Sequence, residues 1–238
     1  MAMATGGNDV ALVAGRSSGA LLSRLSVMMF LQYFVQGAYL PVASVYVEKS
    51  LGFPAWAVGA FASALAVGPV VAPFIVGQLV DRLFATERVV AACHLVGGVL
   101  MLWLSRESSI SLVIAIGTVY SVLYVPTMML TNSLAFQHLK NSNLEFPWIR
   151  AFGTLGFIVP AYLVELWWLR GLEGPPLDKA RSIVFVFSGL AGIAMACYCL
   201  TLPHTPPKGR AERTYAPGIV LTMLRNRDFL VLVIVSFL

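Results

Sequence analysis

Six long apolar runs constrain the fold of this chain more than any other feature. The hydrocarbon core of a bilayer is about 30 Å thick, so a helix needs roughly 20 consecutive apolar residues to cross it. Backbone groups in lipid must form hydrogen bonds within their own segment, so each run predicts a helix rather than an open strand. We therefore expect an all-α membrane protein. The expected spans are 22–47, 54–80, 88–105, 109–136, 147–169 and 182–203.

The charged residues are few, and their placement predicts an orientation. They make up 11% of the chain, against about 25% in soluble domains. Arg150 lies inside a span and is left out of the count. If the N-terminus is cytoplasmic, ten of the remaining basic residues fall on the cytoplasmic side of the membrane and five on the other. This bias agrees with the positive-inside rule, so the net charge of +5 indicates topology and not a nucleic-acid partner. The cytoplasmic ten are Arg16, Arg24, Arg82, Arg88, Lys140, Lys208, Arg210, Arg213, Arg225 and Arg227.

Four segments are expected along the chain. A cytoplasmic tail (1–21) precedes the six-helix bundle (22–203), and a proline-rich, basic linker (204–228) follows it. A new apolar run at 229–238 resembles the start of a seventh transmembrane helix. Ten residues of helix cover only about half the hydrocarbon core, so we expect the front part of a longer, two-bundle protein.

Two spans share a motif. Span one contains Tyr39-Leu-Pro41, and span four contains Tyr124-Val-Pro126 at a similar depth. A proline inside a helix frees a carbonyl and bends the axis. Matching interruptions in two three-helix repeats point to a central binding site in secondary transporters.

Charged residues flank the turn between spans two and three. Gly77-Gln-Leu-Val-Asp81-Arg82, with Arg88 at the start of span three, resembles the signature of the major facilitator superfamily at this place. The match is partial, because the residues at 83–87 lack the family's glycine and further basic residues. The resemblance implies a gating contact, and an ordinary charged turn is the alternative.

Span five places an arginine inside a membrane helix. Arg150, Thr154 and Phe157 are spaced i, i+4 and i+7 and therefore share one face. An arginine at mid-membrane costs at least about 2.5–3.5 kcal/mol, so it normally faces a polar cavity or a partner. The alternatives are that Arg150 reaches the lipid headgroups or pairs with Glu145.

Several short strings recur along the spans, namely Leu31-Gln32 with Gly37, Cys93-His94, Tyr124-Val-Pro126-Thr127 with Asn132, Phe146-Pro147 through Ile149-Arg150, Gly153-Thr154-Leu-Gly156-Phe157, and Thr201-Leu-Pro-His204. Their order resembles the nucleoside:proton symporter family of the major facilitator superfamily. In that family the substrate site lies between two bundles, and the resemblance implies that Arg150, Thr154 and Phe157 serve it. It also implies a nucleoside substrate, a proton gradient as driving force and no cofactor, with the proton-linked acid in the missing second bundle.

Other polar residues within the spans are further candidates. Gln32 and Gln36 share a face of span one and either line the cavity or bridge helices, as does Asn132 in span four. We expect His94 to make a local hydrogen bond. Glu165 precedes two tryptophans typical of the membrane interface, so it is not expected to carry the proton.

Other function classes remain to be weighed. A major facilitator transporter for a sugar, oligosaccharide or drug would share this fold, and so would a half-length fragment that transports nothing. An intramembrane enzyme is not expected, because the sequence offers no catalytic set, and three cysteines within apolar runs offer no metal site. The favoured interpretation is a multi-pass nucleoside transporter of the cytoplasmic (inner) membrane.

The charge bias gives a test of topology. The linker should lie in the cytoplasm, so Lys208→Cys in intact cells should not react with a membrane-impermeant thiol reagent until the membrane is opened. Labelling from outside would contradict the predicted orientation.

Overall fold

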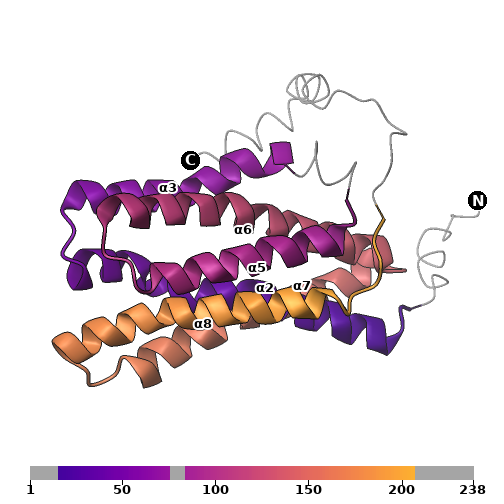
Figure 1. The fold of residues 1–238 in the computed structure, drawn as a ribbon. Coiled ribbons are helices and arrows are strands. Elements are labelled where there is room, and N and C mark those ends of the chain that lie inside the picture. The colour runs from indigo at the N-terminus through magenta and orange to yellow at the C-terminus, as the bar shows by residue number, and fades with distance from the viewer. Residues whose placement is uncertain (1–15, 76–83, 207–238) are drawn as a thin grey trace, which may run out of the picture. The chain divides into compact units, whose positions relative to one another are not determined.

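Six long helices form a bundle in this computed structural model, which describes residues 16–75 and 84–206 (Figure 1). All six are long and apolar enough to cross a membrane. One π-helical turn extends α2, and another extends α7. The expected all-α architecture with six spans is confirmed for the described residues. The elements are α2 (Gly19–Val45), η1 (Tyr46–Ser50), α3 (Ala55–Ile75), α5 (Thr86–Leu104), α6 (Ile110–His138), α7 (Ser142–Leu163), η3 (Val164–Trp168) and α8 (Pro175–Cys199).

Two helices begin well before the membrane spans expected for them. α8 begins at Pro175 instead of 182, because proline suits the first helical positions, where no backbone N–H is needed. Asp178 therefore lies inside α8, and it pairs with Arg181 at 3.4 Å. α7 begins at Ser142, so Pro147, at the start of the expected span, lies within the helix.

The remaining segment boundaries stay predictions. Most of the expected linker, from residue 207 on, and the expected seventh helix (229–238) lie outside the described residues.

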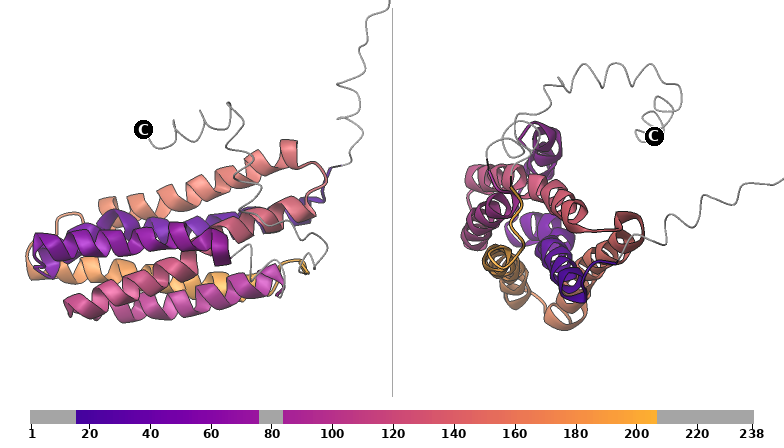
Figure 2. Two further views of the ribbon diagram at one scale, coloured as in Figure 1. Left: turned by 90° about the horizontal axis from the view of Figure 1, so that it is seen from above. Right: turned by 90° about the vertical axis from the view of Figure 1, so that its right-hand side faces the viewer.

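The helices of the bundle pack in pairs. α2 packs mainly on α7, α3 on α6, and α5 on α8, as the end-on view of Figure 2 illustrates. Pro41 lies inside α2 and Pro126 inside α6, which are the first helices of the two expected three-helix repeats. The pairing of α2 with α7 and of α6 with α3 agrees with two such repeats.

α2 and α7 approach each other most closely at two glycines. A Cβ atom added to Gly37 would collide with the backbone carbonyl of Phe157, and one added to Gly156 with that of Phe30. Helices in lipid gain no hydrophobic drive to associate, so close approach of small residues is what lets dispersion forces hold them together. The two glycines therefore fix the distance between the helices.

Two buried carboxylates fasten chain segments at the end of the bundle where α2 begins. Ser17 donates its backbone N–H and its hydroxyl to Glu145, both at 2.7 Å. Glu87 accepts the backbone N–H of Thr205 at 3.0 Å, and its other oxygen lies 2.7 Å from Nδ1 of His204. Both contacts join segments far apart in the sequence and so tie the helix ends together.

The glycine contacts predict that alanine destabilises the bundle at the two contact positions and not at a glycine outside the contact. Gly37→Ala and Gly156→Ala should each destabilise the bundle by about 1–3 kcal/mol, because overpacking forces the two backbones apart. Gly59→Ala in α3 is the matched control, since its Cβ would meet nothing within 4 Å, and it should leave stability unchanged or raise it. Thermal unfolding of the purified chain in detergent measures the difference. Equal losses at all three positions would contradict the close contact.

Candidate functional site

Arg150 lies more than two turns into α7, and its side chain is partly buried. Its Cζ atom lies 4.3 Å from the centroid of the Tyr33 ring on α2. Such a cation–π contact gains about 0.5–1 kcal/mol at an exposed site and about 2 kcal/mol when desolvated. The ring therefore holds the planar guanidinium in a defined orientation.

A glycine leaves the space for this stack. A Cβ atom on Gly153 would lie 2.8 Å from Cδ2 of Tyr33 and 2.9 Å from Nη1 of Arg150. Cβ atoms essentially never approach other heavy atoms so closely, so a larger residue would displace one partner of the stack. Gly153 therefore accommodates the side chain of Arg150.

Glu145 is not the partner of Arg150. Its two carboxylate oxygens accept the hydrogen bonds from Ser17, and one of them also accepts the backbone N–H of Asn141 at 3.3 Å. No ion pair of Arg150 occurs among residues 16–75 and 84–206. Its guanidinium N–H groups thus keep their capacity to bind acceptors from outside these segments.

The other predicted substrate residues continue the same face. Thr154 is exposed one turn after Arg150, and Phe157 is partly buried one turn further, where its backbone meets Gly37. On α2, Gln36 follows Tyr33 by one turn and is partly exposed. The structure thus brings Arg150, Thr154, Phe157 and Gln36 together along one side of the α2–α7 contact.

Gln32 occupies a different place from Gln36. Its side chain is fully buried, donates to the Thr127 hydroxyl at 2.8 Å and lies 2.9 Å from Nε2 of His94. Its backbone carbonyl accepts the Tyr124 hydroxyl at 2.6 Å. Gln32 therefore bridges α2, α5 and α6, which is the second of the two roles expected for it, and a substrate role for it stays a prediction.

Sequence reasoning missed several of these partners. Tyr33 follows directly on the string Leu31-Gln32, but nothing in the sequence pairs it with Arg150. His94 was expected to bond locally, whereas its ring bonds to Gln32 on another helix. Asn132 was expected either to line the cavity or to bridge helices, and its buried Oδ1 has no hydrogen-bond partner in the described part of the chain.

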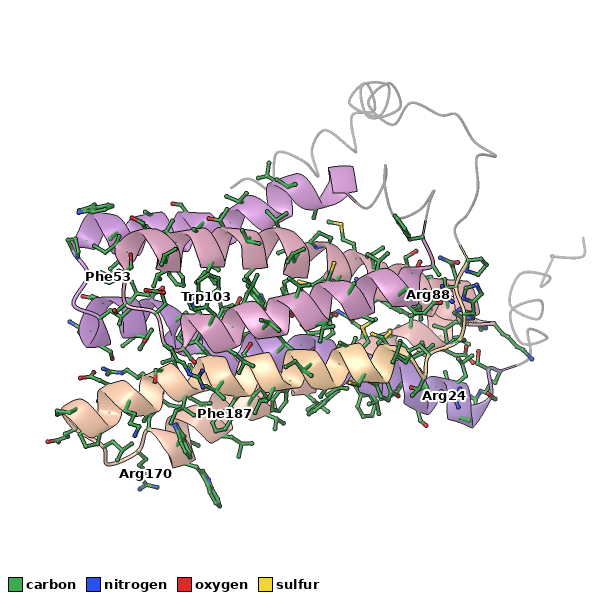
Figure 3. The ribbon with its side chains drawn as sticks, viewed as in Figure 1. Arg24, Phe53, Arg88, Trp103, Arg170 and Phe187 are labelled. Carbon is green, nitrogen blue, oxygen red and sulfur yellow. The ribbon has the colours of Figure 1, made fainter. Side chains whose placement is uncertain are left out.

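Most of the predicted gating motif cannot be placed. Gly77, Asp81 and Arg82 lie outside the described residues. Arg88 is exposed at the start of α5, at the same end of the bundle as Arg24 (Figure 3). The neighbouring Glu87 is the carboxylate that holds His204 and Thr205.

Comparison with known proteins decides the family. Residues 20–238 match the family described as nucleoside H+ symporter. The chain belongs to this family. It is therefore an integral membrane protein of a transporter family and not an enzyme, and the family resemblance inferred from the strings is confirmed.

Relatives and a solved structure agree with this assignment. The chain is 30% identical to the putative nucleoside transporter YegT of Escherichia coli, covering 91% of this chain and 51% of the relative. It is also 30% identical to the xanthosine permease of Escherichia coli, covering 79% of this chain and 44% of the permease. A crystal structure of the nucleoside transporter NupG matches with a TM-score of 0.74 at 24% identity, over 90% of this chain and 53% of that one. This similarity confirms the major facilitator fold.

The matches cover most of this chain but only part of each relative. This chain of the nucleoside H+ symporter family spans about half the length of the curated relatives it matches.

The two glutamines of α2 give a test of the interior network. Gln32→Leu removes the buried hydrogen bonds of the Gln32 side chain to the Thr127 hydroxyl and Nε2 of His94, and each such bond contributes about 0.5–1.5 kcal/mol to stability. Gln36→Leu is the control on the same helix and should leave the midpoint of thermal unfolding unchanged. A larger shift for Gln36→Leu than for Gln32→Leu would contradict the assigned roles.

Proposed function

We propose that this chain forms one of the two helical bundles of a proton-driven nucleoside importer in the cytoplasmic (inner) membrane. Family membership supports the nucleoside substrate and the proton gradient as driving force, with no cofactor. The distribution of basic residues supports a cytoplasmic N-terminus. A second bundle would form the opposite wall of the substrate cavity.

The observation that carries the proposal is the orientation of Arg150. Its guanidinium lies on the Tyr33 ring and has no carboxylate partner in the described segments. An arginine inside a membrane helix normally faces a polar cavity or a partner. The planar fork that Tyr33 holds can bind two acceptor atoms of a ligand at once.

The neighbouring side chains complement the groups of a nucleoside. The exposed hydroxyl of Thr154 and the amide of Gln36 can exchange hydrogen bonds with ribose hydroxyls or base carbonyls. The Phe157 ring can stack on a base, because aromatic rings favour offset stacking. The site therefore combines a fixed cation, two neutral polar groups and an aromatic ring on one side of the bundle.

Substitution of Arg150 in the full-length protein with both bundles tests this role. Arg150→Lys should reduce uridine uptake about as much as Arg150→Ala, on the order of tenfold or more, because lysine keeps the charge but loses the planar fork. Tyr33→Phe should retain uptake and Tyr33→Leu should reduce it, since only the ring is needed for the stack.

Arg24→Lys is the control, because Arg24 lies exposed near the start of α2. Uptake is normalised to the amount of protein in the membrane, and excess maltose serves as a competitor to test the sugar alternative. If Arg150→Lys transports at the parental rate, Arg150 is a headgroup anchor and the proposed site is wrong. Competition by maltose but not by adenosine would favour a sugar transporter.

A further inference from the structure

An apolar groove runs along the outside of the bundle between α7 and α8. Both helices pack on α2 but make hardly any contact with each other, so α2 forms the floor of the groove. The groove has a volume of about 690 Å³, which lies within the range of about 300–1,000 Å³ typical of ligand pockets. Aromatic and aliphatic side chains line it, among them Phe30, Phe34, Leu163, Trp167, Phe187 and Leu190.

This groove is separate from the proposed substrate face. Leu163 follows Thr154 by nine residues, and at roughly 3.6 residues per turn the two lie on opposite sides of α7. On α2, Phe34 and Gln36 are two residues apart and so lie on nearly opposite sides as well. The groove and the Arg150 face therefore flank the α2–α7 contact on its two sides.

One end of the groove opens at a pair of tryptophans. Trp167 and Trp168 also line a second cavity of about 410 Å³, which continues the groove toward the loop before α8. Trp168 is held in place because its Nε1 donates to the carbonyl of Ala180 at 3.1 Å and its ring packs edge-on against Phe187 at 5.3 Å. Tryptophan gathers at the headgroup level of a bilayer, which indicates the depth of this opening.

A lysine marks the same opening. Lys179 lines the second cavity and is exposed. Asp178, the acid beside it, is paired with Arg181, and Lys179 has no ion pair in the described part of the chain. Arg170, in the loop after η3, lies toward the same end of the molecule (Figure 3). Glu165 and Glu173 are exposed in this region but do not line the cavity, whose one charged lining residue among the described residues is Lys179.

We propose that the groove binds one anionic glycerophospholipid, with an acyl chain between α7 and α8 and the phosphate at Lys179. The apolar walls match a hydrocarbon chain, and each buried methylene contributes to binding. The lysine stem can lie along the tryptophans while its ammonium reaches the phosphate. The lipid belongs to the leaflet at the Trp167 end of the bundle.

Native mass spectrometry of the delipidated chain tests the proposal. Phosphatidylglycerol and phosphatidylcholine with identical acyl chains are titrated into the protein, and the dissociation constant of the first bound lipid is compared. Phosphatidylglycerol should bind about fivefold more tightly, as expected for one basic side chain at a headgroup. Lys179→Gln should abolish this preference. Lys49→Gln, an exposed lysine at the same end that pairs with Glu48, should keep it.

A groove-filling substitution provides the second arm. Ala194→Trp places an indole inside the groove. It should weaken the binding of both lipids by tenfold or more, because several methylenes of the acyl chain lose their contacts. Ala92→Trp on α5 is the matched control at a similar depth and is exposed outside the groove. If the two tryptophan substitutions had equal effects, or if the two lipids bound with equal affinity, the bound lipid would be ordinary surrounding lipid with no specific site. Either result would overturn the proposal. A dimer mass that Ala194→Trp abolishes would overturn it as well, since a second copy would then fill the groove.

Discussion

Gly37 and Gly156 bring the backbones of α2 and α7 into direct contact, and the candidate site is built on that contact. Within a bilayer, burial of apolar surface does not drive helices together, so their separation depends on how closely the backbones can pack. Because α2 and α7 touch at these glycines, the ring of Tyr33 reaches the guanidinium of Arg150. A wider separation would leave a cation in the membrane without its aromatic support, which is costly at that depth.

Polar groups in this bundle serve two purposes, and α2 carries an example of each. Gln32 is fully buried and bonded to His94 and Thr127, so it joins three helices in the interior of the bundle. Gln36, one turn along, is partly exposed and available to a ligand. Satisfied polar networks make a bundle specific and rigid, whereas unpaired groups on its surface can bind substrate. On α2, Gln32 thus stabilises the bundle, whereas Gln36 is available to the candidate site.

The sequence predicts those features that depend on local periodicity and on bilayer thickness. The six spans follow from apolar length, and the common face of Arg150, Thr154 and Phe157 follows from helical spacing. The start of α8 at Pro175 was missed, because polar residues can extend a helix beyond the lipid. Partners such as Tyr33 for Arg150 and Ser17 for Glu145 depend on which helices become neighbours, and no local pattern encodes that.

The central claim is that one side of the α2–α7 contact forms a wall of the nucleoside site. Protection of a cysteine by substrate tests it most directly, in the full-length protein with Cys93, Cys197 and Cys199 replaced. The account predicts that uridine slows the reaction of Thr154→Cys with a small thiol reagent, whereas Leu163→Cys on the opposite side of α7 shows no protection. If Thr154→Cys reacts at the same rate with and without uridine in a protein that still transports it, the nucleoside does not bind at this wall.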